Sequence, residues 1–145
     1  ALSDKVKEEV DFVITFEELA AIFVAADIEL TKVDEKEEIN DASYYGRAYA
    51  NAGGVAEAIR QNLKEKYDID PSITKADGLT DCKKTLTKAK AGVLDGHLIE
   101  GMACEGGCVG GPGTLLSTKR GNKYVKEFAD ESPYKLAFEN DKIND

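Results

Sequence analysis

The sequence predicts an α/β protein with a mostly parallel sheet flanked by helices. Short apolar runs with β-branched residues alternate along the chain with stretches in which apolar residues recur at helical spacing. Gly and Pro residues punctuate these segments, as at residues 53–54 and 70–71. A glycine-rich loop directly follows one apolar run, at residues 104–113. Alternating strand and helix patterns favour a parallel sheet, in which functional loops lie at the carboxyl ends of strands.

The first half of the chain predicts one strand and two helices. Residues 11–15 form a short apolar run that predicts a buried strand. Thr15 and Glu18 form a capping-box pair at the start of a helix over residues 16–26. A polar loop over residues 31–43 follows, and a second amphipathic helix is predicted over residues 55–67, after a Gly-Gly turn.

The second half predicts two strands and two helices. In order, these are a strand over 73–79, a helix over 80–91, a strand over 97–103 and a helix over 121–129. We expect Thr80 to cap the first of these helices and Gly92 to end it. Tyr134, Leu136 and Phe138 indicate a final docked turn.

Charge and composition exclude several classes of function. The net charge of −9 argues against nucleic acid as a partner and against an anionic membrane surface. No apolar run approaches the roughly 20 residues of a membrane span. Three cysteines do not make a disulfide framework, so we expect a reducing, cytoplasmic setting. The chain starts without Met, and we expect it to be a processed or cut piece of a longer protein.

Cys104 and Cys108 are the candidate metal ligands. Thiolates select iron–sulfur clusters, zinc or copper(I), and a glycine-rich loop offers backbone N–H groups to a cluster. A 4Fe–4S cluster usually takes four cysteines, whereas the chain has three. Either the pair is no metal site, or the other ligands lie outside the chain. A structural turn, a zinc site and a redox dithiol remain alternatives.

The residues around this pair carry a resemblance to a known family. The run from Glu100 through Met102-Ala103-Cys104, Gly106-Gly107-Cys108 and Gly110-Gly111 resembles the third cysteine signature of iron-only hydrogenases. Residues 10–19 resemble the family's strand and helix after its second signature, and residues 52–58 resemble its internal glycine turn and helix. The tail after about residue 116 has no clear counterpart.

The resemblance implies an H-cluster, in which a 4Fe–4S cubane is joined to a two-iron unit carrying CO and cyanide. Four cysteines hold it in the family, and two of them come from signatures upstream. Cys104 would be a cubane ligand, and Cys108 would be the ligand that also bridges to the two-iron unit. Met102 would pack beside that unit, and Gly106 and Gly107 would contact the cofactor. Met102 and Cys108 are the implied catalytic residues.

The resemblance also implies an activity and partners. Residues 1–145 would be the C-terminal portion of the catalytic domain, half of the hydrogenase fold, with 117–145 as a helical tail. The parent would interconvert protons and dihydrogen with a ferredoxin or similar electron carrier. The chain alone, without the N-terminal half of the domain, would be inactive and bind no cofactor. Glu105 and Pro112-Gly113 depart from the usual signature, so a non-catalytic hydrogen-sensing or protein-binding module is the alternative.

Overall fold

The computed structural model describes residues 9–33, 41–94, 96 and 98–143. The chain divides into two compact units, the first comprising residues 1–36 with 112–115 and the second comprising 37–111 with 116–145. Helices and a parallel pair of strands confirm the predicted α/β class. In the described part of the chain, no helix is long and apolar enough to cross a membrane.

The first unit contains helix α1, Phe16–Ala25. The predicted capping box is present: the Glu18 N–H donates to Oγ1 of Thr15 at 3.2 Å, and the Thr15 N–H donates to Oε2 of Glu18 at 2.7 Å. Two orphan N–H groups of the first turn region are thereby satisfied within four residues of sequence. This local reciprocity is why the start of α1 was predictable from sequence.

The strand predicted over residues 11–15 is wrong. These residues form no strand, and Phe12 and Val13 are 85% and 73% exposed. A strand exists only where a second strand satisfies its backbone groups. The described residues of the first unit contain no strand, so the β-branched run has nothing to pair with there.

The second unit is built around a β–α–β segment. Strands β1, Ile73–Asp77, and β2, Leu98–Met102, pair in parallel, with helix α4, Leu79–Lys90, as the crossover between them. Register runs from Ile73 opposite Leu98 to Asp77 opposite Met102. Both strands were predicted, although His97, the expected first residue of the second, lies outside the described residues.

The ends of α4 differ from the prediction at one side only. The helix is capped by Gly78 rather than Thr80, which lies inside its first turn. The strand ends at Asp77, so the chain must turn at once, and Gly78 adopts φ +90° there. At the other end the N–H of Gly92 donates to the Ala89 carbonyl at 3.0 Å, and the helix stops where predicted.

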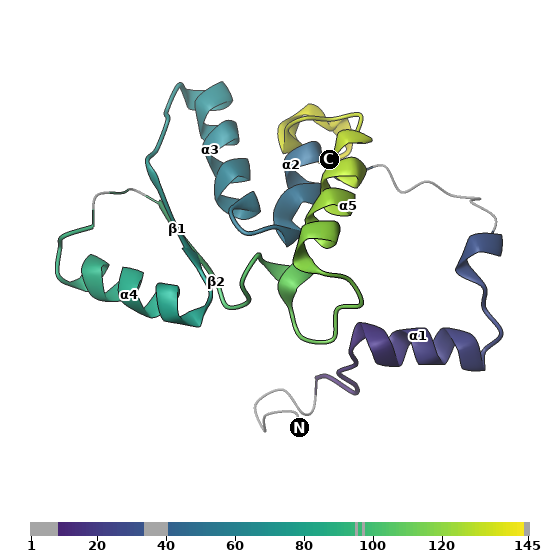
Figure 1. Cartoon of the computed structure of the whole chain (residues 1–145). Helices are drawn as coiled ribbons and strands as arrows, with labels where there is room; N and C mark the ends of the chain where they lie inside the picture. The colour runs from purple at the N-terminus through teal and green to yellow at the C-terminus, as the bar shows by residue number, and fades with distance from the viewer. Residues whose placement is uncertain (1–8, 34–40, 95, 97, 144–145) are drawn as a thin grey trace. The chain divides into compact units, whose positions relative to one another are not determined.

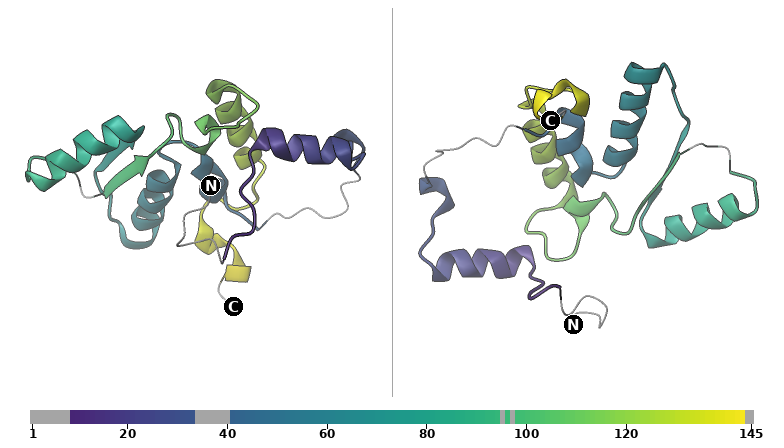
Figure 2. Two further views of the ribbon diagram at one scale, coloured as in Figure 1. Left: turned by 90° about the horizontal axis from the view of Figure 1, so that it is seen from below. Right: turned by 180° about the vertical axis from the view of Figure 1, so that it is seen from behind.

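Helix α3, Gly54–Tyr67, also contacts the strand pair. Figures 1 and 2 show α3 and α4 on opposite sides of the strands. The buried apolar residues of the described chain are few and mostly small: Ala56, Ala58, Ala76, Ala129 and the larger Leu136. Small side chains let the helices approach the strands closely but bury little apolar area.

A cluster of helices packs against α3. Short helix α2, Tyr44–Arg47, lies against helix α5, Thr118–Asp130 (Figure 1). The sequence missed α2, and α5 begins earlier than the predicted start at Gly121. The predicted final turn is present at Ala137–Glu139, preceded by buried Leu136.

The C-terminal tail is anchored to the start of this cluster. Asn140 is 1% exposed, and its amide N–H donates to the Asp41 carbonyl at 2.7 Å. Its Oδ1 accepts the Lys142 N–H at 3.0 Å, and the Lys142 ammonium pairs with Asp41 at 2.6 Å. The tail is therefore an integral part of the second unit.

Candidate functional site

The cysteine loop begins where β2 ends, at the carboxyl end of a parallel strand as predicted. Its backbone folds back on itself. The Gly107 N–H donates to the Cys104 carbonyl at 3.0 Å, and the Gly111 N–H donates to the Cys108 carbonyl at 3.1 Å. Residues Cys108–Gly110 form a 3-10 turn. Cys104 and Cys108 therefore belong to one compact, internally bonded turn.

A second segment of the chain holds the middle of this loop. The Ala52 N–H donates to the Gly106 carbonyl at 3.1 Å, and Asn51 and Gly107 form an isolated antiparallel bridge. Gly107 has φ +89° and ψ −158°, a region that is essentially restricted to glycine. A Cβ there would lie 2.5 Å from the Ala52 nitrogen and 2.6 Å from the Ala50 carbonyl oxygen. Residue 107 must be glycine for the two segments to meet.

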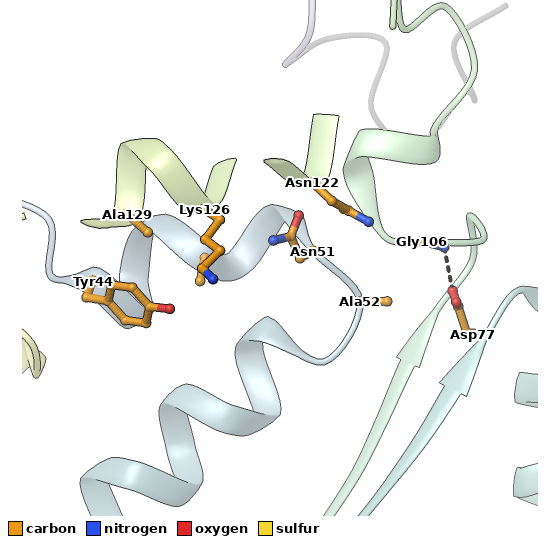
Figure 3. A pocket seen from close by; sticks show the side chains of 9 residues that line it. Tyr44, Asn51, Ala52, Asp77, Gly106, Asn122, Lys126 and Ala129 are labelled. Carbon is orange, nitrogen blue, oxygen red and sulfur yellow. Dashed lines mark hydrogen bonds between the residues drawn. The ribbon is translucent and has the colours of Figure 1, made fainter. Parts of the chain in front are cut away.

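Asp77 holds the same loop from the sheet side. Its Oδ1 accepts the Gly106 N–H at 2.8 Å, as Figure 3 shows. Asp77 is the last residue of β1, directly opposite Met102 in the register, so its side chain reaches a loop that starts just beyond that partner. Sequence reasoning missed Asp77. The available signal was a carboxylate at the end of a predicted strand, at the edge where functional loops gather.

Glu100 is a structural carboxylate that holds helix α3. It is 8% exposed, and its Oε1 accepts the N–H groups of Val55 and Ala56, each at 3.0 Å. These N–H groups belong to the first turn of α3, where backbone donors have no partner within the helix and a negative charge is stabilised. The Glu100 side chain thus fixes the start of α3 to β2, two residues before Met102.

The three cysteines differ in environment. Cys104 is partly buried and Cys108 is exposed, and none of the three forms a disulfide. The partly buried Cys82 thiol donates to the Ala76 carbonyl at 3.6 Å and to the Met102 carbonyl at 3.4 Å. Cys82 therefore packs against the strands as a small side chain with its S–H satisfied. Met102, at the end of β2, is partly buried, and its carbonyl also accepts the Gly78 N–H.

The donor set fits part of an iron–sulfur site. Two soft thiols on a glycine-rich turn are the type of ligand that iron–sulfur clusters take. Among the described residues, no group of three or more His, Cys, Asp or Glu side chains is arranged to hold a metal ion. The pair Cys104 and Cys108 can therefore supply two ligands of a four-thiolate shell, and the described residues do not complete it.

A hollow of about 480 Å³ lies beside the loop and shares Gly106 and Asp77 with it. Figure 3 shows side chains from several elements around it. Its lining residues are Tyr44, Ala48, Asn51, Ala52, Asp77, Gly106, Asn122, Lys126 and Ala129. Within the described structure, Oδ1 of Asn51 and Oδ1 of Asn122 are buried without a hydrogen-bond partner. Neither Cys104 nor Cys108 lines this hollow.

Some titratable groups away from the loop have pKa values that are shifted from their ordinary values. The hydrogen bond from the Arg60 guanidinium lowers the pKa of Asp70, and the same pair raises the pKa of Arg60. Burial raises the pKa of the Tyr45 phenol, with a further contribution from Glu57. The hydrogen bond to Asp41 raises the pKa of Lys142. These shifts describe surface ion pairs and packing between helices.

Comparison with known proteins places the chain in a family. A search of curated proteins gave no match. A family model described as iron only hydrogenase large subunit, C-terminal domain, matches residues 1–112, which include both strands of the sheet and the cysteine loop as far as Pro112. Helix α5 and the tail lie beyond the match. The model covers more than half of the sequence, and the chain therefore belongs to the family of the iron-only hydrogenase large subunit, C-terminal domain.

Proposed function

We propose that Cys104 and Cys108 are ligands of the H-cluster of an iron-only hydrogenase that interconverts protons, electrons and dihydrogen. Family membership implies an iron–sulfur cluster in the parent protein. The single observation that supports our assignment of the ligands is their placement on one compact glycine turn at the carboxyl end of β2, with Cys108 exposed. When bound, the cluster supplies the redox chemistry, and the protein holds and tunes it.

The number of cysteine thiols limits how many cluster ligands the chain can supply. A four-thiolate shell cannot be made from three cysteines, and the Cys82 thiol is already engaged by two carbonyl groups. We infer that the remaining thiolates come from residues outside these 145. The chain alone is then inactive as a hydrogenase and holds no complete cluster.

We propose the following roles for residues in and next to the loop. Cys104 and Cys108 would each supply a thiolate ligand to the cluster, with Cys108 as the ligand nearer the two-iron unit. Gly106 and Gly107 keep the backbone close to the cluster because they carry no side chain. Met102 would pack beside the two-iron unit. Glu100 acts indirectly, because it fixes β2 to the start of α3 immediately before the loop.

The test is the iron content of purified protein after anaerobic maturation. We expect the chain extended to its natural N-terminus to bind iron and to show the infrared bands of CO and cyanide, and we expect the 145-residue chain to do neither. Cys104→Ser and Cys108→Ser should each abolish the infrared bands. Cys82→Ser is the matched control and should keep them. An extended chain without iron would contradict the proposal, as would full retention of the bands in both loop variants.

Hydrogen sensing is the second candidate. It is favoured by Glu105, which directly follows Cys104 in the sequence, and by Pro112-Gly113, because both depart from the signature of typical members. Turnover decides between the two functions. An extended, iron-loaded chain that binds dihydrogen but evolves it only slowly from reduced ferredoxin would support sensing, and rapid evolution would support catalysis.

Partners follow from the same proposal. In the second unit, Leu79, Leu86 and Val93 are exposed, as expected where another part of the domain covers a surface. We propose the N-terminal half of the same catalytic domain as that cover, and a ferredoxin or similar carrier as the electron partner. The three free thiols fit a reducing compartment, and we propose the cytoplasm.

A further inference from the structure

We propose that Asp77 is a positioning residue that orients the cysteine loop through the N–H of Gly106. No ligand role is proposed for Asp77 itself. Its effect on a bound cluster rests on the proposed function above, whereas its effect on the loop does not.

The position of Asp77 is fixed before it reaches the loop. It is the last paired residue of β1, opposite Met102. Its own N–H donates to Oδ2 of Asp81 in the first turn of α4 at 3.2 Å. Backbone pairing on one side and this bond on the other leave mainly the side-chain torsions free. The position of the Asp77 carboxylate is therefore set mainly by the backbone of β1, because the Asp side chain is short.

The contact falls at the centre of the loop. Gly106 lies between Cys104 and Cys108, and its N–H donates to Oδ1 of Asp77 across 2.8 Å. Its carbonyl accepts the Ala52 N–H at 3.1 Å. The residue between the two thiols is thus held through both of its backbone polar groups, by two segments that are distant in sequence. A bond to an ionised acceptor is shorter and stronger than one between neutral groups.

This arrangement has two consequences for a cluster held by the thiols. The Gly106 N–H is directed at a carboxylate and is not free to donate to a cluster sulfur. A negative charge also stands next to the loop. Fewer N–H donors and an added negative charge both stabilise the oxidised cluster, and hydrogen bonds and net charge set the potentials of such clusters. Asp77 therefore lowers the reduction potential of the site.

Two substitutions at Asp77 separate the hydrogen bond from the charge, and a third, at another residue, is the control. Asp77→Ala removes both, and Asp77→Asn removes the charge but keeps an acceptor oxygen. Asp130→Ala is the matched control, because Asp130 is an exposed carboxylate at the C-terminal end of α5 in the same unit. Unfolding curves for all three variants show that any effect is measured on folded protein.

The first measurement is amide hydrogen exchange at Gly106 in the 145-residue chain, followed by NMR. We expect exchange to be faster in Asp77→Ala by on the order of fivefold, the factor that corresponds to one net hydrogen bond. Asp77→Asn should exchange at a rate closer to that of the unsubstituted chain, and Asp130→Ala should leave the rate unchanged. Equal rates in the unsubstituted and Asp77→Ala chains would overturn the proposal, and so would equal loss of protection in the Ala and Asn variants.

The second measurement is the cluster's reduction potential in the extended, iron-loaded protein, followed by electron paramagnetic resonance. Both Asp77 variants should have a more positive potential than the unsubstituted protein, with iron content unchanged. An unchanged potential would overturn the tuning role. If the extended protein binds no iron, the proposed function fails, while the exchange result still decides whether Asp77 positions the loop.

Discussion

Oε1 of Glu100 lies 3.0 Å from the backbone nitrogen of Ala56, in a buried contact that joins strand β2 to the first turn of helix α3. The same oxygen also accepts the Val55 N–H. One carboxylate oxygen thus satisfies two backbone donors that have no partner within the helix. Since Glu100 stands two residues before Met102, this contact determines where the strand that leads into the cysteine loop is anchored.

Replacing Glu100 with Ala should therefore destabilise the second unit. We expect a loss of about 1–3 kcal/mol in the free energy of unfolding, because two buried N–H groups lose their acceptor. Urea unfolding followed by circular dichroism measures it. Glu105→Ala is the control, an exposed carboxylate in the loop itself, and should change stability by less than about 0.5 kcal/mol. Equal stability of the two variants would contradict the capping role.

Gly107 should tolerate no side chain. In Gly107→Ala the new Cβ meets backbone atoms of Ala50 and Ala52, and the backbone angles suit only glycine. We expect a loss of about 3 kcal/mol or more from strain and displacement of the loop. Gly92→Ala is the matched control for Gly107→Ala. Gly92 also has a positive φ, but no atom outside its own chain neighbours lies within 4 Å of the place that a Cβ would take. It should cost about 1 kcal/mol. Thermal unfolding compares the two.

Thiol reactivity should follow the environments of the three cysteines. Exposed Cys108 should react first with iodoacetamide, followed by partly buried Cys104. Cys82 should react last, because its thiol donates to two carbonyl oxygens beneath helix α4. Mass spectrometry of peptides after timed alkylation gives the order, and the same reaction in urea should make the three rates similar. Cys82 reacting as fast as Cys108 in the folded chain would contradict the packing described here.

The Arg60–Asp70 pair should make stability depend on pH in the acid range. Arg60 Nε lies 2.5 Å from Oδ1 of Asp70, and Nη2 lies 3.2 Å from Oδ2. The hydrogen bond from Arg60 lowers the pKa of Asp70 below its ordinary value of 3.8. A carboxyl with a lower pKa in the folded state stabilises the fold above its unfolded pKa. This contribution is lost as pH falls through the folded pKa.

Asp70→Asn removes this titration. The stability of the variant should therefore fall less steeply than that of the parent below about pH 4. Asp68→Asn removes the same charge from an exposed residue nearby and is the control for the change in net charge. Urea midpoints across the acid range test this. Parallel curves for the parent and Asp70→Asn would show that the pair contributes nothing to the pH dependence.

The parts of the fold that were predictable are those specified by neighbours in sequence. Thr15 and Glu18 cap α1 within three residues of each other, and the periodicity of residues 55–67 is sufficient to place α3. Helix α2 escaped prediction because it has only four residues, too few to show periodicity. The strand predicted over residues 11–15 failed because pairing depends on a partner that local sequence does not specify.

In the candidate site, too, the features that depend on neighbours in sequence could be predicted, and the contacts between distant residues could not. The spacing of Cys104 and Cys108 and the position of their loop after a strand could be read from sequence. The contacts that hold the loop could not. Asp77 meets Gly106 across 29 residues of sequence, and Glu100 meets Ala56 across 44. Both contacts depend on the register of β1 against β2 and on the docking of α3, which are properties of the folded chain.

Arg47 bonds directly to helix α5, which lies beyond the family match. Its buried guanidinium donates through Nη1 to the Phe128 carbonyl at 2.8 Å and through Nε to the Ala42 carbonyl at 3.2 Å. It also lies 4.3 Å from the centre of the Phe128 ring. The Phe128 carbonyl belongs to the last turn of α5, where carbonyl groups lack helical partners and a cation is favoured.

Arg47→Lys keeps the charge but loses the planar fork, so it cannot make both bonds and stack on the ring at once. We expect a loss of about 1–3 kcal/mol in the free energy of unfolding. Arg120→Lys is the control, because Arg120 is exposed on the same α5 and donates to Tyr124 at 3.4 Å. Its cost should stay below about 0.5 kcal/mol.

If α5 were dispensable to the family domain, deleting residues 116–145 would leave the unfolding of the rest unchanged. The contacts of Arg47 predict instead that this deletion destabilises the second unit at least as much as Arg47→Lys does.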